Sequence, residues 1–404
     1  MDLELEWHGR EAADIVGQVR GLCYGTSQQA VPDYPQHLAS DERIVADDLL
    51  LARRNDEPVG TATSYSMRMW ARGQAFPCQG VAYVGTIKTA RRSGGVASAI
   101  LRETLKKARE RGQVVSALMP FRASFYEHFG YGLVERRASW TIPLSVLPTG
   151  PTDGFRFITG VDDPRRACRQ RMVEAGQCDI ERSAGSWGVH LQNEREGFVV
   201  ADQPQKGGPM RSWWHWGQIK KNDKDVLHVY DHAFDSVESL RRALSFFATL
   251  KDQFSAVTIA LQADFPLNRY LNETQVPHRP VNHDTAEVRT FTRMQVRVLD
   301  HARLISGLHL PADARGRVVV AIAEDGNAVT ALRIEVEGGR ATARPTSEPP
   351  DVECTAQTWA AIVLGDLPAT RAAAMGLIRP SAPAAAKLLD IFAAGPAPHS
   401  NEYF

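Results

Sequence analysis

The chain has 404 residues, of which 43% are hydrophobic and 23% charged, a balance typical of a globular protein with two or three domains. Lysine plus arginine and aspartate plus glutamate both number 47, so the formal net charge is zero, which argues against a nucleic-acid partner. The five cysteines are scattered without a C-x-x-C pair, which argues against a zinc or redox motif and favours free thiols. The polar start and the lack of an apolar run of about 18 residues predict a cytoplasmic protein with no membrane partner.

Alternating strands and helices are predicted for the first third of the chain. Apolar residues recur at helical spacing over 10–25 and again over 96–112, and each run ends at a glycine. Between these helices the pattern predicts a Pro-rich loop over 28–42, two strands joined by a turn over 49–70, and a β-rich run over 80–90. A short buried strand is expected over 113–120.

A segment rich in proline and glycine, 143–154, marks a domain boundary. The second region is again mixed α/β and resembles a diverged duplicate of the first, with strands predicted over 197–202, 211–219, 225–234 and 256–261 and a helix over 235–253. In the third region, antiparallel hairpins over 315–346 precede Ala-rich helices between 351 and 395, as in a small α+β domain. We therefore predict three domains, over 1–145, 146–284 and 285–404.

A basic, Gly-containing loop precedes the helix that begins at Val96. Gly94 and Gly95 would let the backbone expose its N–H groups at the helix N-terminus, where phosphate binds well. Arg91 and Arg92 add positive charge beside it. The loop lacks both the G-K-[ST] of a Walker A motif and G-x-G-x-x-G, so it favours a pyrophosphate on a carrier other than ATP or NAD. The alternative is a basic loop that caps a surface helix.

The run "MPFRASFYEHFGYGLVERRASW", residues 119–140, concentrates aromatic side chains. Phe125, Tyr126 and Phe129 recur at helical spacing, Gly130 ends the helix, and a strand is expected over 132–140. The pattern alone allows two interpretations. The helix either packs against a core or turns a polar-tipped aromatic toward an active site.

These two segments resemble the GNAT acetyltransferases. Arg92, Gly95 and Ala97 match the family's R/Q-x-x-G-x-G/A loop, which grips the pyrophosphate of acetyl-CoA, and "FYEHFGYG" is similar to its FYxxxGF/Y ending. The degenerate second region, the C-terminal α+β domain and the aromatic end resemble, more narrowly, the Eis family ("enhanced intracellular survival"). Eis proteins combine a GNAT domain, a GNAT-like domain and a domain similar to sterol carrier proteins.

The resemblance implies a fold class of α/β and α+β, with an N-terminal GNAT domain, a degenerate GNAT-like domain and a sterol-carrier-protein-like domain whose C-terminus reaches the active site. It implies an acetyl-CoA-dependent N-acetyltransferase without a metal. In it, Tyr126 is the general acid that reprotonates the CoA thiolate and the carboxylate of Phe404 is the general base. A phenol with a pKa near 10 suits a thiolate with a pKa of ~8.5 or above.

The resemblance also places a set of residues at the cofactor, namely Gly85, Thr86, Ile87, Arg92, Ser93, Gly94, Gly95, Val96, Ala97, Ser98, Phe121 and Arg122. Two residues depart from the family pattern. Thr89 stands where proline is frequent, and Gly85 stands where a β-branched residue is common. We expect Gly85 to let the cofactor approach the strand closely.

The acceptor is expected to be a primary amine of a small molecule, and an aminoglycoside-type polyamine is one candidate because some Eis proteins acetylate aminoglycosides. The nearby acidic residues Asp33, Asp41 and Glu42 are few for a polycation. Aromatic or basic residues that could line the pocket are Tyr24, Tyr34, His37, Tyr65, Trp70 and Phe76. His37 is also a rival base. A homo-oligomer, by analogy a hexamer, is expected.

Three alternatives stay open at this point. The chain could bind CoA or an apolar ligand without catalysis, use a different acyl-CoA, or acetylate protein lysines. In the second region, Trp214 and Trp216 share one face of a strand, where core or interface packing is favoured over a ligand platform. His228 and His232 would lie about 13 Å apart on a strand, too far for one metal ion.

Overall fold

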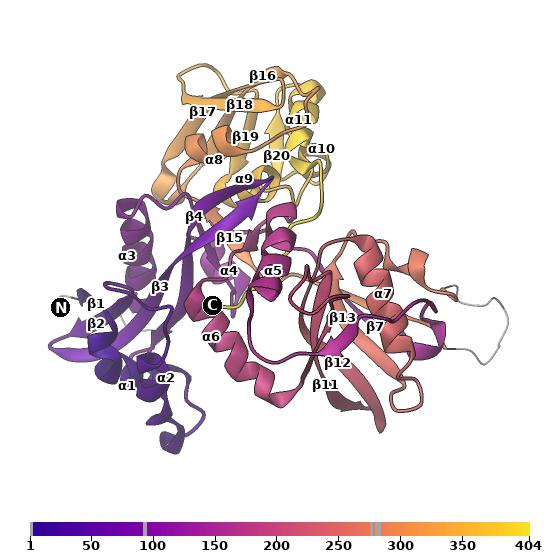
Figure 1. The fold of residues 1–404 in the computed structure, drawn as a ribbon. Coiled ribbons are helices and arrows are strands. Elements are labelled where there is room, and N and C mark those ends of the chain that lie inside the picture. Colours follow the sequence, from indigo (N-terminus) through magenta and orange to yellow (C-terminus); the bar gives the residue numbers. More distant parts are fainter. Residues whose placement is uncertain (1–2, 92–94, 275–277, 279–283) are drawn as a thin grey trace.

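The computed structural model describes residues 3–91, 95–274, 278 and 284–404, and these residues form three β-sheets with helices packed against them (Figure 1). In Figure 1 the first sheet lies at the left, the second at the right and the third at the top. Each sheet contains both antiparallel and parallel strand pairs. This arrangement confirms the predicted combination of α/β and α+β layers.

The first sheet is built mainly from the first third of the chain, in the order β1-β2-β3-β4-β5-β15-β6, with β9 beside β3. Its strands are β1 Leu3–His8, β2 Leu49–Arg54, β3 Glu57–Ala71, β4 Gln74–Thr86, β5 Val115–Leu118, β6 Gly132–Leu133, β9 Asp179–Ile180 and β15 Gln295–Val298. The associated helices are α1 Ala13–Tyr24, α2 Asp33–Ala39, α3 Val96–Glu110 and α4 Ala123–Glu127. The helices predicted over 10–25 and 96–112 are thereby confirmed as α1 and α3.

Helix α3 shows how the sequence pattern positions the first sheet's cleft. Ile100, Leu101 and Leu105 recur at helical spacing and are buried against the sheet, whereas the charged residues between them face outward. Gly95, in the left-handed region at φ +69°, lets the chain turn from β4 into the helix. The helix therefore begins beside the end of β4.

The second sheet has the order β14-β7-β13-β12-β11-β10-β8. Its strands are β7 Arg137–Pro143, β8 Phe155–Phe157, β10 Phe198–Asp202, β11 Ser212–Lys221, β12 Lys224–Phe234, β13 Ala256–Gln262 and β14 Glu287–Phe291, and its helices are α5 Asp163–Ala175, α6 Ala184–Asn193 and α7 Val237–Ala248. Trp214 and Trp216 are both buried in its core, which confirms the packing role predicted for them.

The third sheet has the order β18-β17-β16-β19-β20. Its strands are β16 Gly316–Ala323, β17 Val329–Glu337, β18 Arg340–Pro345, β19 Val352–Thr355 and β20 Ile378–Pro380, and its helices are α8 His301–Gly307, α9 Ala356–Val363, α10 Ala369–Ala374 and α11 Pro383–Leu389. The predicted hairpins are confirmed. One apolar core joins this sheet to the first, since Met69 and Phe76 cluster with Trp359 and Val320. Across the described part of the chain, no helix is long and apolar enough to cross a membrane.

The single strand expected over 132–140 is wrong, because the structure divides it between two sheets. β6 pairs with β15 in the first sheet, and β7 pairs with β13 and β14 in the second. Between them lies the fully buried Glu135, whose carboxylate accepts hydrogen bonds from Arg137 and from the backbone N–H of Arg293. A buried carboxylate needs such hydrogen-bond partners. The chain is not in a strand where Glu135 reaches them, between β6 and β7. As a result, two strands pair across the predicted domain boundaries.

The Pro-rich loop expected over 28–42 is also wrong in part, because it contains the helix α2. Pro32 stands at its N-cap and Pro35 lies in its first turn. Proline is tolerated there because the first N–H groups of a helix have no partner within it. A Cβ on Gly17 of α1 would overlap the backbone of Pro35, so a glycine on α1 allows the two helices to pack closely.

Candidate active site

A cleft of about 610 Å³ opens at the N-terminus of α3, and we call it the α3 cleft. Its walls are Cys23, Tyr24, Val84, Gly85, Thr86, Ala90, Arg91, Gly95, Val96, Ala97, Ser98, Phe121 and Phe125. In the described part of the helix no side chain caps the first turn, so its N–H groups are available to an anion. A Cβ on Gly95 would meet open space, so the positive φ alone favours glycine there. Free N–H groups at a helix N-terminus are suited to binding a phosphate.

Most of the expected cofactor residues lie at this cleft. The structure brings together Gly85, Thr86, Gly95, Val96, Ala97, Ser98 and Phe121. Ile87 follows β4 and precedes a short 3-10 turn at Lys88–Ala90, and Arg122 is the exposed N-cap of α4. Arg92, Ser93 and Gly94 lie outside the described residues. The cleft also includes Cys23, which no local pattern of the sequence indicated.

Gly85 also packs closely against α1. A Cβ at this position would lie 2.9 Å from Cβ of Cys23 and 3.0 Å from Cε2 of Tyr24, both on α1. Real Cβ atoms do not approach carbon atoms so closely. The glycine therefore makes room for α1 against β4, and it also lines the α3 cleft.

A β-bulge in β4 stands at the edge of the α3 cleft. Opposite β3, Thr61 pairs with Gly85 and Thr63 pairs with Ala82, so β4 carries an extra residue, and Tyr83 has φ +53°. Bulges of this kind re-aim side chains and are frequent next to active sites. Here Val84 lines the α3 cleft, whereas its neighbour Tyr83 lines a second cavity. The two cavities therefore adjoin at the bulge.

Tyr126 lies on α4 behind the aromatic wall of the α3 cleft. Its side chain is 5% exposed, and its ring centroid is 5.9 Å from that of Phe121 and 5.0 Å from that of Phe125, both of which line the cleft. Burial raises the pKa of Tyr126 to about 12. The phenol therefore stays protonated at neutral pH and can donate a proton.

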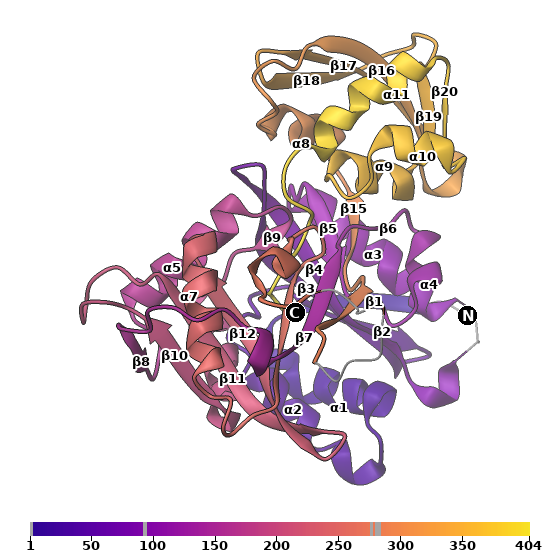
Figure 2. The ribbon, with the colours of Figure 1, turned by 90° about the vertical axis from the view of Figure 1, so that its right-hand side faces the viewer.

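The second cavity, of about 590 Å³, lies between the first and second sheets, and we call it the Phe404 cavity. Its walls are Arg43, Tyr83, Val189, His190, Gln192, Asn193, Glu196, His215, Tyr230, Asp231, Asn401, Glu402, Tyr403 and Phe404. A smaller cavity of about 320 Å³ shares Arg43 and Phe404 with it and is also lined by Tyr65 and Met67. Residues 402–404 line both cavities, and we call residues 399–404 the 399–404 segment. Figures 1 and 2 both place the C-terminal end in the middle of the molecule.

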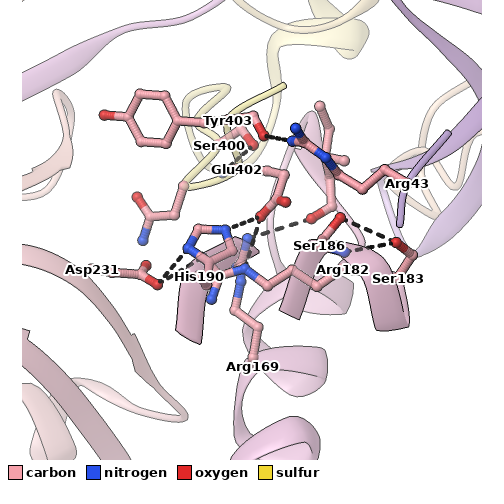
Figure 3. A network of polar contacts seen from close by, with 12 residues as sticks. Arg43, Arg169, Arg182, Ser183, Ser186, His190, Asp231, Ser400, Glu402 and Tyr403 are labelled. Carbon is pink, nitrogen blue, oxygen red and sulfur yellow. Dashed lines mark hydrogen bonds and ion pairs between the residues drawn. The ribbon is translucent and has the colours of Figure 1, made fainter. Parts of the chain in front are cut away.

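Ion pairs hold the 399–404 segment in place (Figure 3). Arg182 lies 2.8 Å from a carboxylate oxygen of Glu402, and His190 forms a hydrogen bond of 3.0 Å with the same oxygen. Burial alone would raise the pKa of Glu402, but the charges of Arg182 and His190 outweigh it and lower the pKa to about 2. Arg182 also lies 2.8 Å from Asp231, so one guanidinium serves two carboxylates.

The first domain contacts the same segment from the other side. Arg43 donates to the carbonyl oxygen of Tyr403 at 3.2 Å and pairs with Asp41, to which Tyr65 donates at 2.8 Å. The ring of Phe404 packs against two apolar clusters, the core that the first and third sheets share and the one beside α1. A Cβ on Gly80 would lie 2.9 Å from Cδ2 of this ring, so Gly80 makes room for it.

The structure does not bring together all the aromatic residues and the histidine expected around the substrate. Tyr24 lines the α3 cleft, where its hydroxyl donates to the carbonyl oxygen of Val84 at 2.6 Å. Phe76 is buried in the shared core against Gly307, and Trp70 is half-buried, with its indole N–H 2.8 Å from Glu181. Tyr34 is half-buried and His37 exposed, both on α2. Among the described residues, Phe76 and Trp70 line neither the α3 cleft nor the Phe404 cavity.

Sequence reasoning missed the contribution of the second sheet. His190 on α6, His215 on β11 and Tyr230 and Asp231 on β12 all line the Phe404 cavity. His215 is 4% exposed, its Nε2 has no hydrogen-bond partner within the described residues, and burial lowers its pKa. Their positions in the sequence follow no motif, so no local signal indicated them.

Comparisons with known proteins agree with this architecture. The model of the acetyltransferase (GNAT) domain matches residues 12–134, and that of the sterol carrier protein domain matches residues 304–401. A protein of Streptomyces avermitilis described as an uncharacterized N-acetyltransferase is 24% identical over 393 residues, which cover 90% of this chain and 88% of the relative. Both lines of similarity point to the same class of enzyme.

Several solved structures match the whole chain. A GCN5-related N-acetyltransferase from Anabaena variabilis has a TM-score of 0.85 at 16% identity and 100% coverage of both chains. Eis1 from Mycobacterium abscessus has a TM-score of 0.80 at 18% identity and again 100% coverage of both. At such identities the likeness shows the fold.

The chain is therefore an N-acetyltransferase of the GNAT superfamily, a class that uses an acyl-CoA as co-substrate. More narrowly, the chain joins the GNAT domain to a C-terminal sterol carrier protein domain, and its full-length fold is similar to that of Eis1. This confirms the resemblance drawn from the sequence.

Proposed function

We propose that the chain transfers the acetyl group of acetyl-CoA to a primary amine of a small molecule that enters the Phe404 cavity. The observation that carries this proposal is the burial of the 399–404 segment, in which His399 to Glu402 are each less than 9% exposed. This burial brings Phe404 to the wall of a cavity that adjoins the α3 cleft at the β4 bulge.

Acetyl-CoA in the α3 cleft would supply the acetyl group as a thioester. The carboxylate of Phe404 takes a proton from the amine, directly or through water, so that the nitrogen can attack the thioester carbon. The carbon–sulfur bond breaks, and Tyr126 gives its phenolic proton to the sulfur. We favour Phe404 over His37 as the base because His37 lies exposed on α2, whereas Phe404 stands at both hollows.

The charges around the Phe404 cavity bear on the acceptor. Asp231 and Glu402 already pair with Arg182, and Glu196 is the exposed carboxylate of the cavity wall. Paired carboxylates attract a polycation weakly, so an aminoglycoside is one candidate among amines of lower charge. We expect the reaction to take place in the cytoplasm, and we expect a homo-oligomer, by analogy a hexamer, which light scattering would measure.

The test is thiol release from acetyl-CoA across a panel of aminoglycosides, polyamines, small amines and lysine-containing peptides. Activity on a small amine, lost when two residues are added after Phe404, supports both the reaction and the base. Activity on peptides alone would move the acceptor to protein lysines. A series of longer acyl-CoAs tests the acyl group.

Tyr126→Phe tests the acid in the same assay. We expect kcat to fall about 10²- to 10⁴-fold, because a missing proton donor leaves the thiolate unprotonated. The KM for acetyl-CoA should change little. A variant with the wild-type rate would contradict the assignment of Tyr126.

A further inference from the structure

The helix that carries Tyr126 is too short to hold its own shape. α4 spans only five residues, Ala123–Glu127. Isolated helices shorter than about 12 residues are marginal in water, and the last carbonyl groups of any helix lack partners within it. The position of Tyr126 therefore depends on what binds the carbonyl groups of this segment.

Those partners come from the last third of the chain. Gln357, on α9 of the sterol carrier domain, donates from Nε2 to the carbonyl oxygen of Glu127. On β15, Arg297 donates to the carbonyl oxygen of Phe129, and Gln295 donates to that of Ala123 at 3.3 Å. Each end of the α4 segment therefore accepts a hydrogen bond from a side chain more than 160 residues away in the sequence.

The packing beneath the turn is equally close. A Cβ on Gly132 would overlap the carbonyl oxygen of Gln357, and a Cβ on Gly130 would lie 3.2 Å from the guanidinium of Arg297. The glycines of the "FGYG" run therefore let α9 and β15 lie close to the turn and the strand that follow α4. α9 thus donates a hydrogen bond to α4 and packs directly against the turn and the strand β6 that follow it.

The sterol carrier domain also fixes Arg297. Glu324 lies 3.1 Å from the Arg297 guanidinium and 2.9 Å from Nε2 of His301, and Trp359 donates to Nδ1 of His301 at 3.1 Å. Arg297, His301 and Trp359 are all less than 9% exposed. A buried series of hydrogen-bonded polar side chains such as this one is held in a single arrangement, so the core of this domain fixes the orientation of the Arg297 side chain.

We propose that the sterol carrier domain holds α4, the helix that carries the general acid, in position, with Gln357 and Arg297 as positioning residues for Tyr126. We call these contacts the brace. This inference rests on the proposed role of Tyr126 as the general acid. Proton transfer to the departing sulfur requires the phenol within hydrogen-bond reach, and a displacement of about 1 Å can cost a hundredfold in rate. The brace therefore gives the sterol carrier domain, which has no cofactor loop, a part in the reaction at the GNAT domain.

Gln357→Met tests the brace, because methionine keeps the length of the side chain and removes its donor. Gln357 is half-buried, so the variant is expected to fold. The matched control is Gln203→Met in the second sheet, where a buried glutamine also donates to a backbone carbonyl, that of Gly208, at 2.6 Å. Both changes remove a hydrogen bond from a glutamine amide to a backbone carbonyl, and Gln203→Met also removes the oxygen that accepts from Arg156, but only Gln357→Met affects a partner of α4.

Hydrogen exchange of the 121–133 peptide is the first readout, since it needs no known acceptor. The N–H groups of Phe129 and Gly130 bond to the carbonyl groups of Tyr126 and Glu127, each at 2.9 Å. We expect Gln357→Met to speed the exchange of this peptide about tenfold and Gln203→Met to leave it unchanged. Unchanged exchange in Gln357→Met would overturn the brace.

The second readout is the rate. Gln357→Met should lower kcat about tenfold with the KM for acetyl-CoA within about twofold, and it should add nothing in a Tyr126→Phe background. A further loss in that background would overturn the positioning role, because the effect would then not pass through Tyr126. Full activity of Tyr126→Phe alone would instead contradict the acid on which the inference rests, and this outcome is separate from any change in exchange.

Discussion

Glu402→Gln is expected to release the 399–404 segment. Glu402 is 2% exposed, and Arg182 and His190 lower its pKa from 4.5 to about 2. A shift of this size corresponds to roughly 3 kcal/mol of stabilisation by the ionised form. Because the pKa is lowered in the folded protein, this stabilisation is present above pH 4.5 and is lost as the pH falls toward 2. At neutral pH the variant lacks it in full.

Digestion by a carboxypeptidase measures this release, since the enzyme cleaves only an opened C-terminal segment. Roughly 3 kcal/mol corresponds to about a hundredfold larger open population, so clipping at pH 7 should be about a hundredfold faster than in the wild type. Thiol-release activity should decay in step with clipping. Thermal unfolding gives the pH dependence, since the difference between the two proteins should shrink as the pH falls below 4.5.

Glu348→Gln is the matched control. Glu348 also pairs with two arginines, Arg317 and Arg333, but on the exposed face of the third sheet. Exposed ion pairs contribute little, and this one does not touch the segment. A clipping rate of Glu402→Gln within about twofold of both the wild type and this control would refute the reasoning, because the buried pairs would then not hold the segment.

Two further predictions concern the α3 cleft. Gly95→Ala should raise the KM for acetyl-CoA several-fold and lower the free energy of unfolding by about 1 kcal/mol, because alanine is strained at φ +69° although its Cβ would meet only open space. Steady-state kinetics and thermal unfolding measure the two effects, and an unchanged KM would contradict the prediction. The kcat profile should show no descending limb up to about pH 10, since burial raises the pKa of Tyr126 to about 12 and its proton is lost only above that range; a fall in kcat near pH 9 would point to another acid.

Local patterns predicted most of the elements. The helical spacing over 96–112 and the alternation over 315–346 gave α3 and the hairpin strands, because both depend on neighbours in the sequence. The loop predicted over 28–42 failed because the two prolines fall at the start of α2, where they do no harm. A pattern does not reveal which turn of a helix a proline will occupy.

Pairing between distant segments was beyond the sequence. Nothing near residue 135 indicates that β6 and β7 join different sheets, since the cause is a buried carboxylate whose partner Arg293 is 158 residues away. The walls of the Phe404 cavity have the same origin, because β11, β12 and α6 reach it only through the packing of two sheets. The loop and helix of the α3 cleft, in contrast, are contiguous in the chain and could be recognised.

The position of β15 between β5 and β6 also determines when the first sheet can be completed during synthesis. The two neighbours of β15 are synthesised early, since β6 ends at Leu133. The strand that joins them is synthesised much later, because β15 ends at Val298. At about 5–20 residues per second this delay is on the order of ten seconds, during which β5 presents an open edge. The nascent first sheet is therefore exposed to mispairing for far longer than most small domains take to fold, and a fragment that stops after the first region would keep that open edge permanently.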